Sequence, residues 1–83
     1  VLTDIVLRFI PDAAPYVTTK PLHPSQRQKA DESGLEVRLK VIPNFELEKL
    51  VISFGEQVEV VSPMSFRDRV SRRLEGANLQ YQP

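Results

Sequence analysis

The segment Leu35–Val41 restricts the fold of this chain more than any other stretch of its sequence. Apolar residues alternate there with charged ones, as Leu35, Val37, Leu39 and Val41 against Glu36, Arg38 and Lys40. A period of two predicts a β-strand with one buried face and one exposed face. The chain must therefore supply other elements that cover the apolar face of a sheet.

Three more segments have the composition of strands in the same sheet: Ile5–Phe9, Gln26–Ala30 and Val58–Val61. The first is β-branched and aromatic, and it places Ile5, Leu7 and Phe9 on one face. The second is short and polar. The turn residues Asp31–Gly34 would join it to the alternating strand.

Three helices are expected between and after these strands: Ala13–Thr19, Phe45–Phe54 and Pro63–Glu75. Asp12, Asn44 and Ser62 precede them and are candidate N-terminal caps. Gly55 lies where a glycine ends the second helix, and Gly76 is expected to end the third.

The third helix carries one apolar stripe made of Phe66, Val70 and Leu74. We expect this stripe to cover either the edge of the domain or another subunit. Arginines fill the remaining faces of the helix, beside Asp68 and Glu75, and these charges are typical of an exposed helix with weak surface ion pairs.

The predicted order β-α-β-β-α-β-α is that of a ferredoxin-like α+β fold, with an antiparallel sheet and an additional C-terminal helix. The first and third strands would be central, and the first two helices would cover one face. Residues 1–75 are expected to form the domain, and residues 76–83 a C-terminal tail.

The charge balance excludes several classes of function. Eleven basic and eleven acidic side chains give a net charge of zero, which argues against strong nonspecific electrostatic binding to nucleic acid or to an anionic membrane.

The sequence also argues against a metal site, a membrane span and a signal peptide. There is no cysteine and one histidine, so no metal-ligand pair occurs at a known spacing, and we expect no metal or cofactor. No apolar run approaches the length of a membrane span, and the N-terminus resembles neither a signal peptide nor a protein start. We expect a cytoplasmic domain cut from a longer protein.

The only histidine lies in the segment KPLHPSQ, residues 20–26. Pro21 and Pro24 favour extended backbone at the residues before them. His23 could be a general base for Ser25, but no nucleophile motif surrounds that serine. We therefore interpret His23 as a loop residue at a contact surface rather than as a catalyst.

The exposed sheet face would carry Arg8, Arg38 and Lys40 where RNA-binding sheets carry stacking aromatics. Such cations can hold phosphate groups. The alternative is a solvated face whose cations pair with Glu36 and Glu59.

Together, three segments resemble the C-terminal extension (WCX) domain of bacterial WYL-domain transcriptional regulators: Ala14–Val17, Pro21–Gln26 and Ser53–Gly55. The resemblance continues through the alternating strand, Val58–Val61, Ser62–Pro63 and the arginine-rich helix, and it covers nearly the whole chain.

The resemblance implies a non-enzymatic module that senses an effector and helps to build a homodimer, next to the WYL domain of the same protein. The effector would be anionic, a nucleotide or a single-stranded nucleic acid. Operator DNA would be read only by an N-terminal winged helix-turn-helix domain that this chain lacks. By position, Arg8 and the loop residues His23, Ser25 and Gln26 are expected to contact an effector or a partner domain. Arg38 and Lys40 join them as the other cations of the predicted exposed sheet face.

Two other functions stay open at this stage. The domain could be a purely structural oligomerisation module that binds no ligand. It could also be an acylphosphatase-like enzyme on the same fold, although Ile10–Ala13 is acidic and short of donors where such enzymes have a phosphate loop.

Overall fold

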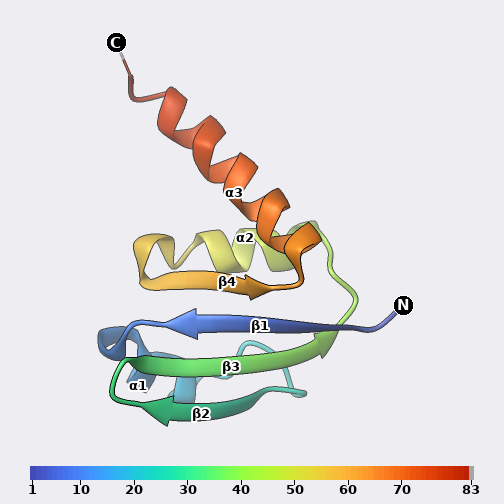
Figure 1. Ribbon diagram of the computed structural model, residues 1–83, viewed down its shortest axis with the longest axis vertical. Helices are drawn as coiled ribbons and strands as arrows, with labels where there is room; N and C mark the ends of the chain where they lie inside the picture. The colour runs from blue at the N-terminus through green and yellow to red at the C-terminus, as the bar shows by residue number, and fades with distance from the viewer. Residues whose placement is uncertain (83) are drawn as a thin grey trace.

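The computed structural model describes residues 1–82. Its strands and helices are β1 (Thr3–Phe9), α1 (Ala14–Thr19), β2 (Arg27–Asp31), β3 (Gly34–Val41), α2 (Phe45–Ile52), β4 (Val58–Ser62) and α3 (Met64–Leu79). Short 3-10 turns, η1 (Pro11–Ala13) and η2 (Gly55–Gln57), precede α1 and β4. The four strands form one antiparallel sheet in the order β2-β3-β1-β4 (Figure 1). This order confirms the predicted α+β, ferredoxin-like arrangement with central β1 and β3.

The register of the central strands assigns each residue to a face of the sheet. Ile5 lies opposite Leu39, Leu7 opposite Val37, and Phe9 opposite Leu35. All six side chains are at most 2% exposed, so they form the centre of the core. The residues between them lie on the other face, as the alternation predicted.

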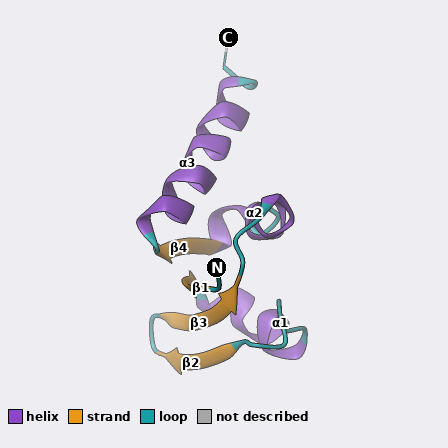
Figure 2. Cartoon of the chain, turned by 90° about the vertical axis from the view of Figure 1, so that its right-hand side faces the viewer, coloured by secondary structure: helices purple, strands orange, loops and turns teal. Residues whose placement is uncertain are grey.

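The helices α1 and α2 pack on the core face, and no helix within residues 1–82 lies over the other face of the sheet (Figure 2). Val17 of α1 and Val51 of α2 are buried against the strands. The side chain of Asn44 caps α2 by accepting a hydrogen bond from the backbone N–H of Leu47 at 2.8 Å, which confirms the predicted cap. Gly55 follows α2 with a positive φ of 57°, the conformation that favours glycine there.

Two predicted helix caps are wrong. Asp12 makes no capping bond, because Pro11 begins the turn η1 and this turn runs directly into α1. Ser62 does not cap α3, since it still belongs to β4 and pairs with Val6. The helix begins one residue later than expected, at Met64, with Pro63 as the flanking residue.

The course of α3 differs from the prediction at its end. Phe66 and Val70 are buried in the domain's own core beside α2 and β4, whereas Leu74 is 42% exposed. The helix does not stop at Gly76 but continues to Leu79, so part of the expected tail is helical. In Figure 1 this last portion projects away from the sheet. Among residues 1–82, no helix is long and apolar enough to cross a membrane.

Candidate functional site

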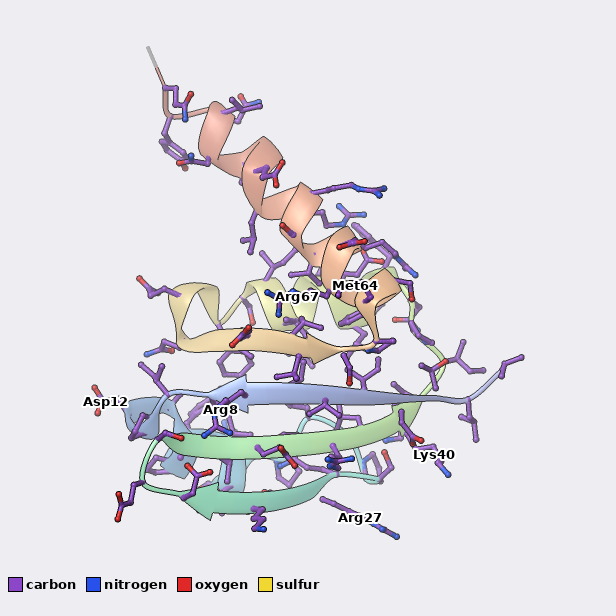
Figure 3. All side chains as sticks on the ribbon, in the orientation of Figure 1. Arg8, Asp12, Arg27, Lys40, Met64 and Arg67 are labelled. Carbon is purple, nitrogen blue, oxygen red and sulfur yellow. The ribbon has the colours of Figure 1, made fainter. Side chains whose placement is uncertain are left out.

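The helix-free face of the sheet, called here the open face, is a mosaic of charges. Strand pairing and alternation place on it five cations, Arg8, Arg27, Lys29, Arg38 and Lys40, and four acids, Asp4, Asp31, Glu36 and Glu59. Figure 3 shows Arg8, Arg27 and Lys40 on three different strands. The predicted trio of Arg8, Arg38 and Lys40 therefore shares one face, although acids are interspersed with it.

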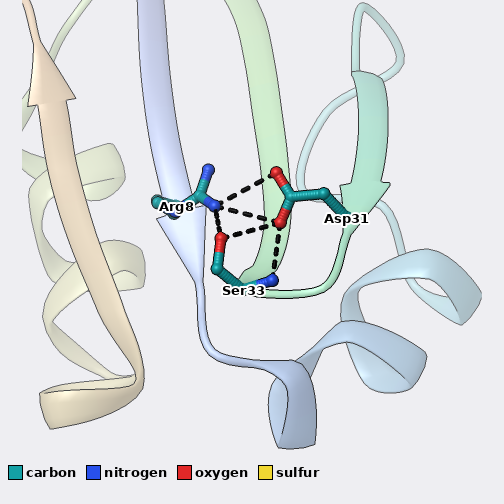
Figure 4. Close-up of polar contacts among 3 residues, drawn as sticks. All are labelled: Arg8, Asp31 and Ser33. Carbon is teal, nitrogen blue, oxygen red and sulfur yellow. Dashed lines mark hydrogen bonds and ion pairs between the residues drawn. The ribbon is translucent and has the colours of Figure 1, made fainter.

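Arg8 is held by the turn between β2 and β3 (Figure 4). Its Nη2 donates to Asp31 Oδ1 at 3.1 Å and to Oδ2 at 3.2 Å, and it also contacts the hydroxyl of Ser33. Ser33 donates to Asp31 through its backbone N–H at 2.8 Å and its hydroxyl at 2.7 Å. These hydrogen bonds, first from Ser33 and then from Arg8, lower the pKa of Asp31 to about 2.

The other two cations of the trio differ in whether they form an ion pair. Arg38 Nε donates to Glu36 Oε2 at 3.0 Å, but the Arg38 side chain stays 60% exposed. Lys40 forms no ion pair with any residue between 1 and 82. The alternative was a face whose cations pair with Glu36 and Glu59. It is correct for Arg38, which pairs with Glu36. Glu59 pairs instead with Arg67 of α3, at 2.8 Å.

The loop around His23 is tied to the start of the sheet by its own hydrogen bonds. His23 Nδ1 accepts the backbone N–H of Ser25 at 3.0 Å, and the Ser25 hydroxyl lies 2.7 Å from the same nitrogen. That hydroxyl accepts the backbone N–H of Lys40 at 3.0 Å. Ser25 thereby binds the β3 backbone two residues before β2 begins at Arg27.

Gln26 has an internal role as well. Its side-chain oxygen accepts the backbone N–H of Leu22 at 2.8 Å, and its Nε2 donates to Gln28 at 2.8 Å and to the Val17 carbonyl at 3.4 Å. Gln26 is half-buried, so it links the loop to α1 rather than facing solvent.

The six predicted site residues do not converge on one point. Arg8 lies opposite Glu36, four residues along β3 from Lys40, a separation of roughly 13 Å at the usual rise per residue. His23 and Lys40 share a hollow of about 450 Å³ that Leu22 and Leu47 also line. The structure therefore groups the loop with Lys40 and leaves Arg8 at the other end of the open face.

Sequence reasoning missed Glu48, which is 3% exposed between α2 and α3. Its carboxylate accepts from Arg73 Nε at 2.6 Å and from Arg69 Nη2. The hydrogen bond from Arg73 is the main cause that keeps the pKa of Glu48 below its ordinary value. Arg69 and Arg73 were expected to form only surface pairs, and this expectation is wrong for both. The spacing in the sequence was the available signal for this buried acid, because Glu48 lies three residues before Val51 on the same side of α2.

Sequence reasoning also missed a second hollow, which lies between α1 and α2. Its volume is about 580 Å³, and its lining includes Tyr16, Lys20, Leu22 and Phe54. No group of three or more His, Cys, Asp or Glu side chains within residues 1–82 could hold a metal ion.

Comparison with known protein families adds one finding. Residues 2–77 match the family model of the WCX domain. No curated protein matches the chain.

Proposed function

The chain belongs to the WCX domain family, and we propose that it is the C-terminal effector-sensing and dimerising module of a bacterial WYL-domain transcriptional regulator. The observation that carries this proposal is the family match across residues 2–77. The WCX domain is associated with regulators and is not a known enzyme family, so we propose no reaction. In the cytoplasm, the WYL domain of the same protein would be its neighbour, and a separate N-terminal domain would read operator DNA.

The open face supports an anionic effector, a nucleotide or a single-stranded nucleic acid. Lys40, Arg27 and Lys29 form no ion pair among residues 1–82. Arg38 uses one nitrogen for Glu36 and keeps its other donors exposed. A guanidinium can therefore bind a phosphate here without leaving its carboxylate partner.

The His23 loop would contribute at the Lys40 end of this face. His23 Nδ1 is occupied by Ser25, so Nε2 is the ring nitrogen that can bond to a ligand or a partner domain. Ser25 and Gln26 would act by holding the loop in place.

The test uses the full-length regulator and its effector-dependent transcription. Arg38→Ala and Lys40→Ala should weaken the response to effector while the domain stays folded, since both side chains are exposed. Lys20→Ala is the matched control, because Lys20 lies over the Tyr16 ring in α1, away from this face. An unchanged response in both variants would mean that the open face does not bind the effector.

The dimerising part of the proposal is supported by α3. Beyond Val70, the helix exposes Leu74 and Leu79, and the turn after it exposes Tyr81; these side chains are 42%, 63% and 89% exposed. Large apolar side chains on a projecting segment are typical of a contact surface. Sedimentation at high concentration tests this. A dimer that Leu79→Glu dissociates would support assembly through α3, and a strict monomer would refute it.

A further inference from the structure

The contact between α2 and α3 contains a buried acid surrounded by more cations than it can neutralise. The Glu48 side chain is 5% exposed, whereas those of Arg69 and Arg73 are 45% and 46% exposed. A buried carboxylate is costly unless it is paired and hydrogen-bonded. Two guanidinium groups satisfy it, and they leave one positive charge in excess.

Each arginine is fixed by only part of its donor set. Arg73 uses Nε toward Glu48 Oε1, and Arg69 uses Nη2 toward Oε2. A guanidinium has five N–H donors, so most donors of both groups stay free and exposed. Because Glu48 already restricts their conformations, a ligand that binds them loses less side-chain entropy.

Aromatic contacts add a third cation to the same surface. The Arg73 guanidinium lies 4.5 Å from the centroid of the Phe45 ring, and Lys49 Nζ lies 5.1 Å from it. Phe45 is 49% exposed, which is unusual for a ring that only packs a core. Arg69 and Arg73 at Glu48, together with Lys49 at the Phe45 ring, leave an excess of two positive charges over the one acid of this cluster.

Among residues 1–82, no acid other than Glu48 forms an ion pair with this cluster. The remaining acids of α2 and α3, Glu46, Asp68 and Glu75, form no ion pair with any residue from 1 to 82. Arg72 lies three residues from Arg69 on α3 and is likewise without an ion pair in this range.

We propose that Arg69, Arg73 and Lys49, arranged by Glu48 and Phe45, form a binding site for a phosphoryl group. Guanidinium forks match phosphate oxygens in pairs, and the ammonium of Lys49 adds a point charge. A free nucleotide or the backbone of a single-stranded nucleic acid could supply the phosphate. The site belongs to α2 and α3, so it is separate from the open face and does not depend on the function proposed for that face.

The test is an NMR titration of the ¹⁵N-labelled chain with inorganic phosphate, AMP or an eight-residue oligothymidylate. The arginine Nε–H signals report directly on Arg69 and Arg73. Saturable shifts of these signals are expected with at least one probe. Tightest binding by AMP would identify a nucleotide as the source of the phosphate, and tightest binding by the oligonucleotide would identify a strand.

Variants separate the proposed site from other cations. Lys49→Gln leaves the Glu48 contacts intact and should weaken binding about 2- to 5-fold, the effect of one partly exposed charge. Arg73→Gln should weaken it at least about tenfold, since a charged hydrogen bond is lost. Lys20→Gln, whose lysine also lies over an aromatic ring, should bind like the wild type.

Two outcomes would overturn the site. One is the absence of saturable shifts at Arg69 and Arg73 with all three probes. The other is unchanged affinity in Lys49→Gln and Arg73→Gln. If Arg38→Ala alone weakened binding, the open face would keep its proposed role and the α2–α3 site would be refuted, so the two proposals fail separately.

Discussion

Glu48 is the residue at which charge and burial conflict most strongly in this domain. A carboxylate on the buried side of α2 is retained because two arginines reach it from α3. Their hydrogen bonds favour its charged form more than burial disfavours it, so the pKa of Glu48 is lowered. The residue thus joins two helices and links the stability of the fold to pH.

The first prediction concerns this link. The folded pKa of Glu48 lies below 4.5, its ordinary value, so in acid the unfolded chain binds more protons than the folded chain. The stabilisation is fully present above about pH 4.5 and is lost as pH falls through the lowered pKa. The urea midpoint of the wild type should therefore fall from pH 5 toward pH 2.5, with Asp31 contributing below its usual pKa of 3.8.

Replacing Glu48 tests the assignment. Glu48→Gln should cost about 1–2 kcal/mol at pH 7 and flatten the decline in acid, because the titrating group is gone. Glu46→Gln is the control, since Glu46 is exposed in the same helix turn. Equal pH profiles for wild type and Glu48→Gln would contradict the assignment.

Gly34 supplies the second prediction. Its φ is 144°, and a Cβ there would overlap the carbonyl oxygen of Phe9. Gly34→Ala should therefore cost at least about 2 kcal/mol in urea unfolding. Gly76 lies within α3 with open space around it, so Gly76→Ala should stabilise by up to about 1 kcal/mol. Equal effects of the two changes would contradict this difference in environment.

Of the three local cap signals in the sequence, Asn44 was confirmed, whereas Asp12 and Ser62 were wrong. Asn44 was recognised as a cap, because an amide side chain before an apolar helical pattern has few other roles. The ion pairs of Arg8 and Arg69 could not be foreseen. Their partners Asp31 and Glu48 are 23 and 21 residues away, and only the tertiary fold brings them together.

At the level of elements, the cap of α2 gives the third prediction. Asn44→Ala removes the acceptor for the Leu47 N–H and should lower the free energy of unfolding by about 1 kcal/mol. Asn44→Asp keeps an acceptor at that position and should restore most of the loss. Thermal unfolding of both variants measures the difference, and equal melting temperatures of Asn44→Ala and wild type would contradict the capping role.

The ends of helices were the least predictable part of the elements. Gly76 was interpreted as a stop, but a glycine inside an exposed helix costs only about 1 kcal/mol. The residues after it contain no proline before position 83, so the helix continues to Leu79. Phe54 was assigned to α2 by its spacing, yet the helix ends at Ile52. Phe54 lies in the turn that follows and packs edge-on against Phe9, with 5.0 Å between the two ring centroids.

The fourth prediction compares two phenylalanines of different burial. Phe66 is 1% exposed, so Phe66→Ala should cost about 3–5 kcal/mol. Phe54 is only half-buried, so Phe54→Ala should cost less, on the order of 2–3 kcal/mol. Urea unfolding measures both changes. If Phe54→Ala lowered the free energy of unfolding more than Phe66→Ala, the packing of α3 in the core would be contradicted.

At the level of the whole molecule, the topology followed from the order of periodic segments. Short connections and right-handed crossovers leave few ways to pair four strands with two intervening helices. The side on which the charges lie also followed, since β3 alternates strictly and β1 departs from alternation only at Val6. How the charges distribute into paired and unpaired groups did not follow, because it depends on distances between side chains of separate elements.

The shape of the molecule separates its two cationic surfaces. The open face lies on the strands, whereas α2 covers the opposite side and α3 runs beyond β4 (Figure 2). A phosphate-bearing strand that engaged both surfaces would have to pass the β4 edge, where Arg67 donates to Glu59 and to the Val60 carbonyl at 2.9 Å.

Fluorescence anisotropy of a short labelled single-stranded DNA tests our proposal that this WCX domain binds a phosphate-bearing effector. We expect the domain to bind at low salt and to lose affinity at moderate salt as counterion release weakens. Lys40→Ala or Lys49→Gln should weaken binding further, and Lys20→Ala should not. No binding at low salt, or binding that neither salt nor these variants change, would contradict the claim.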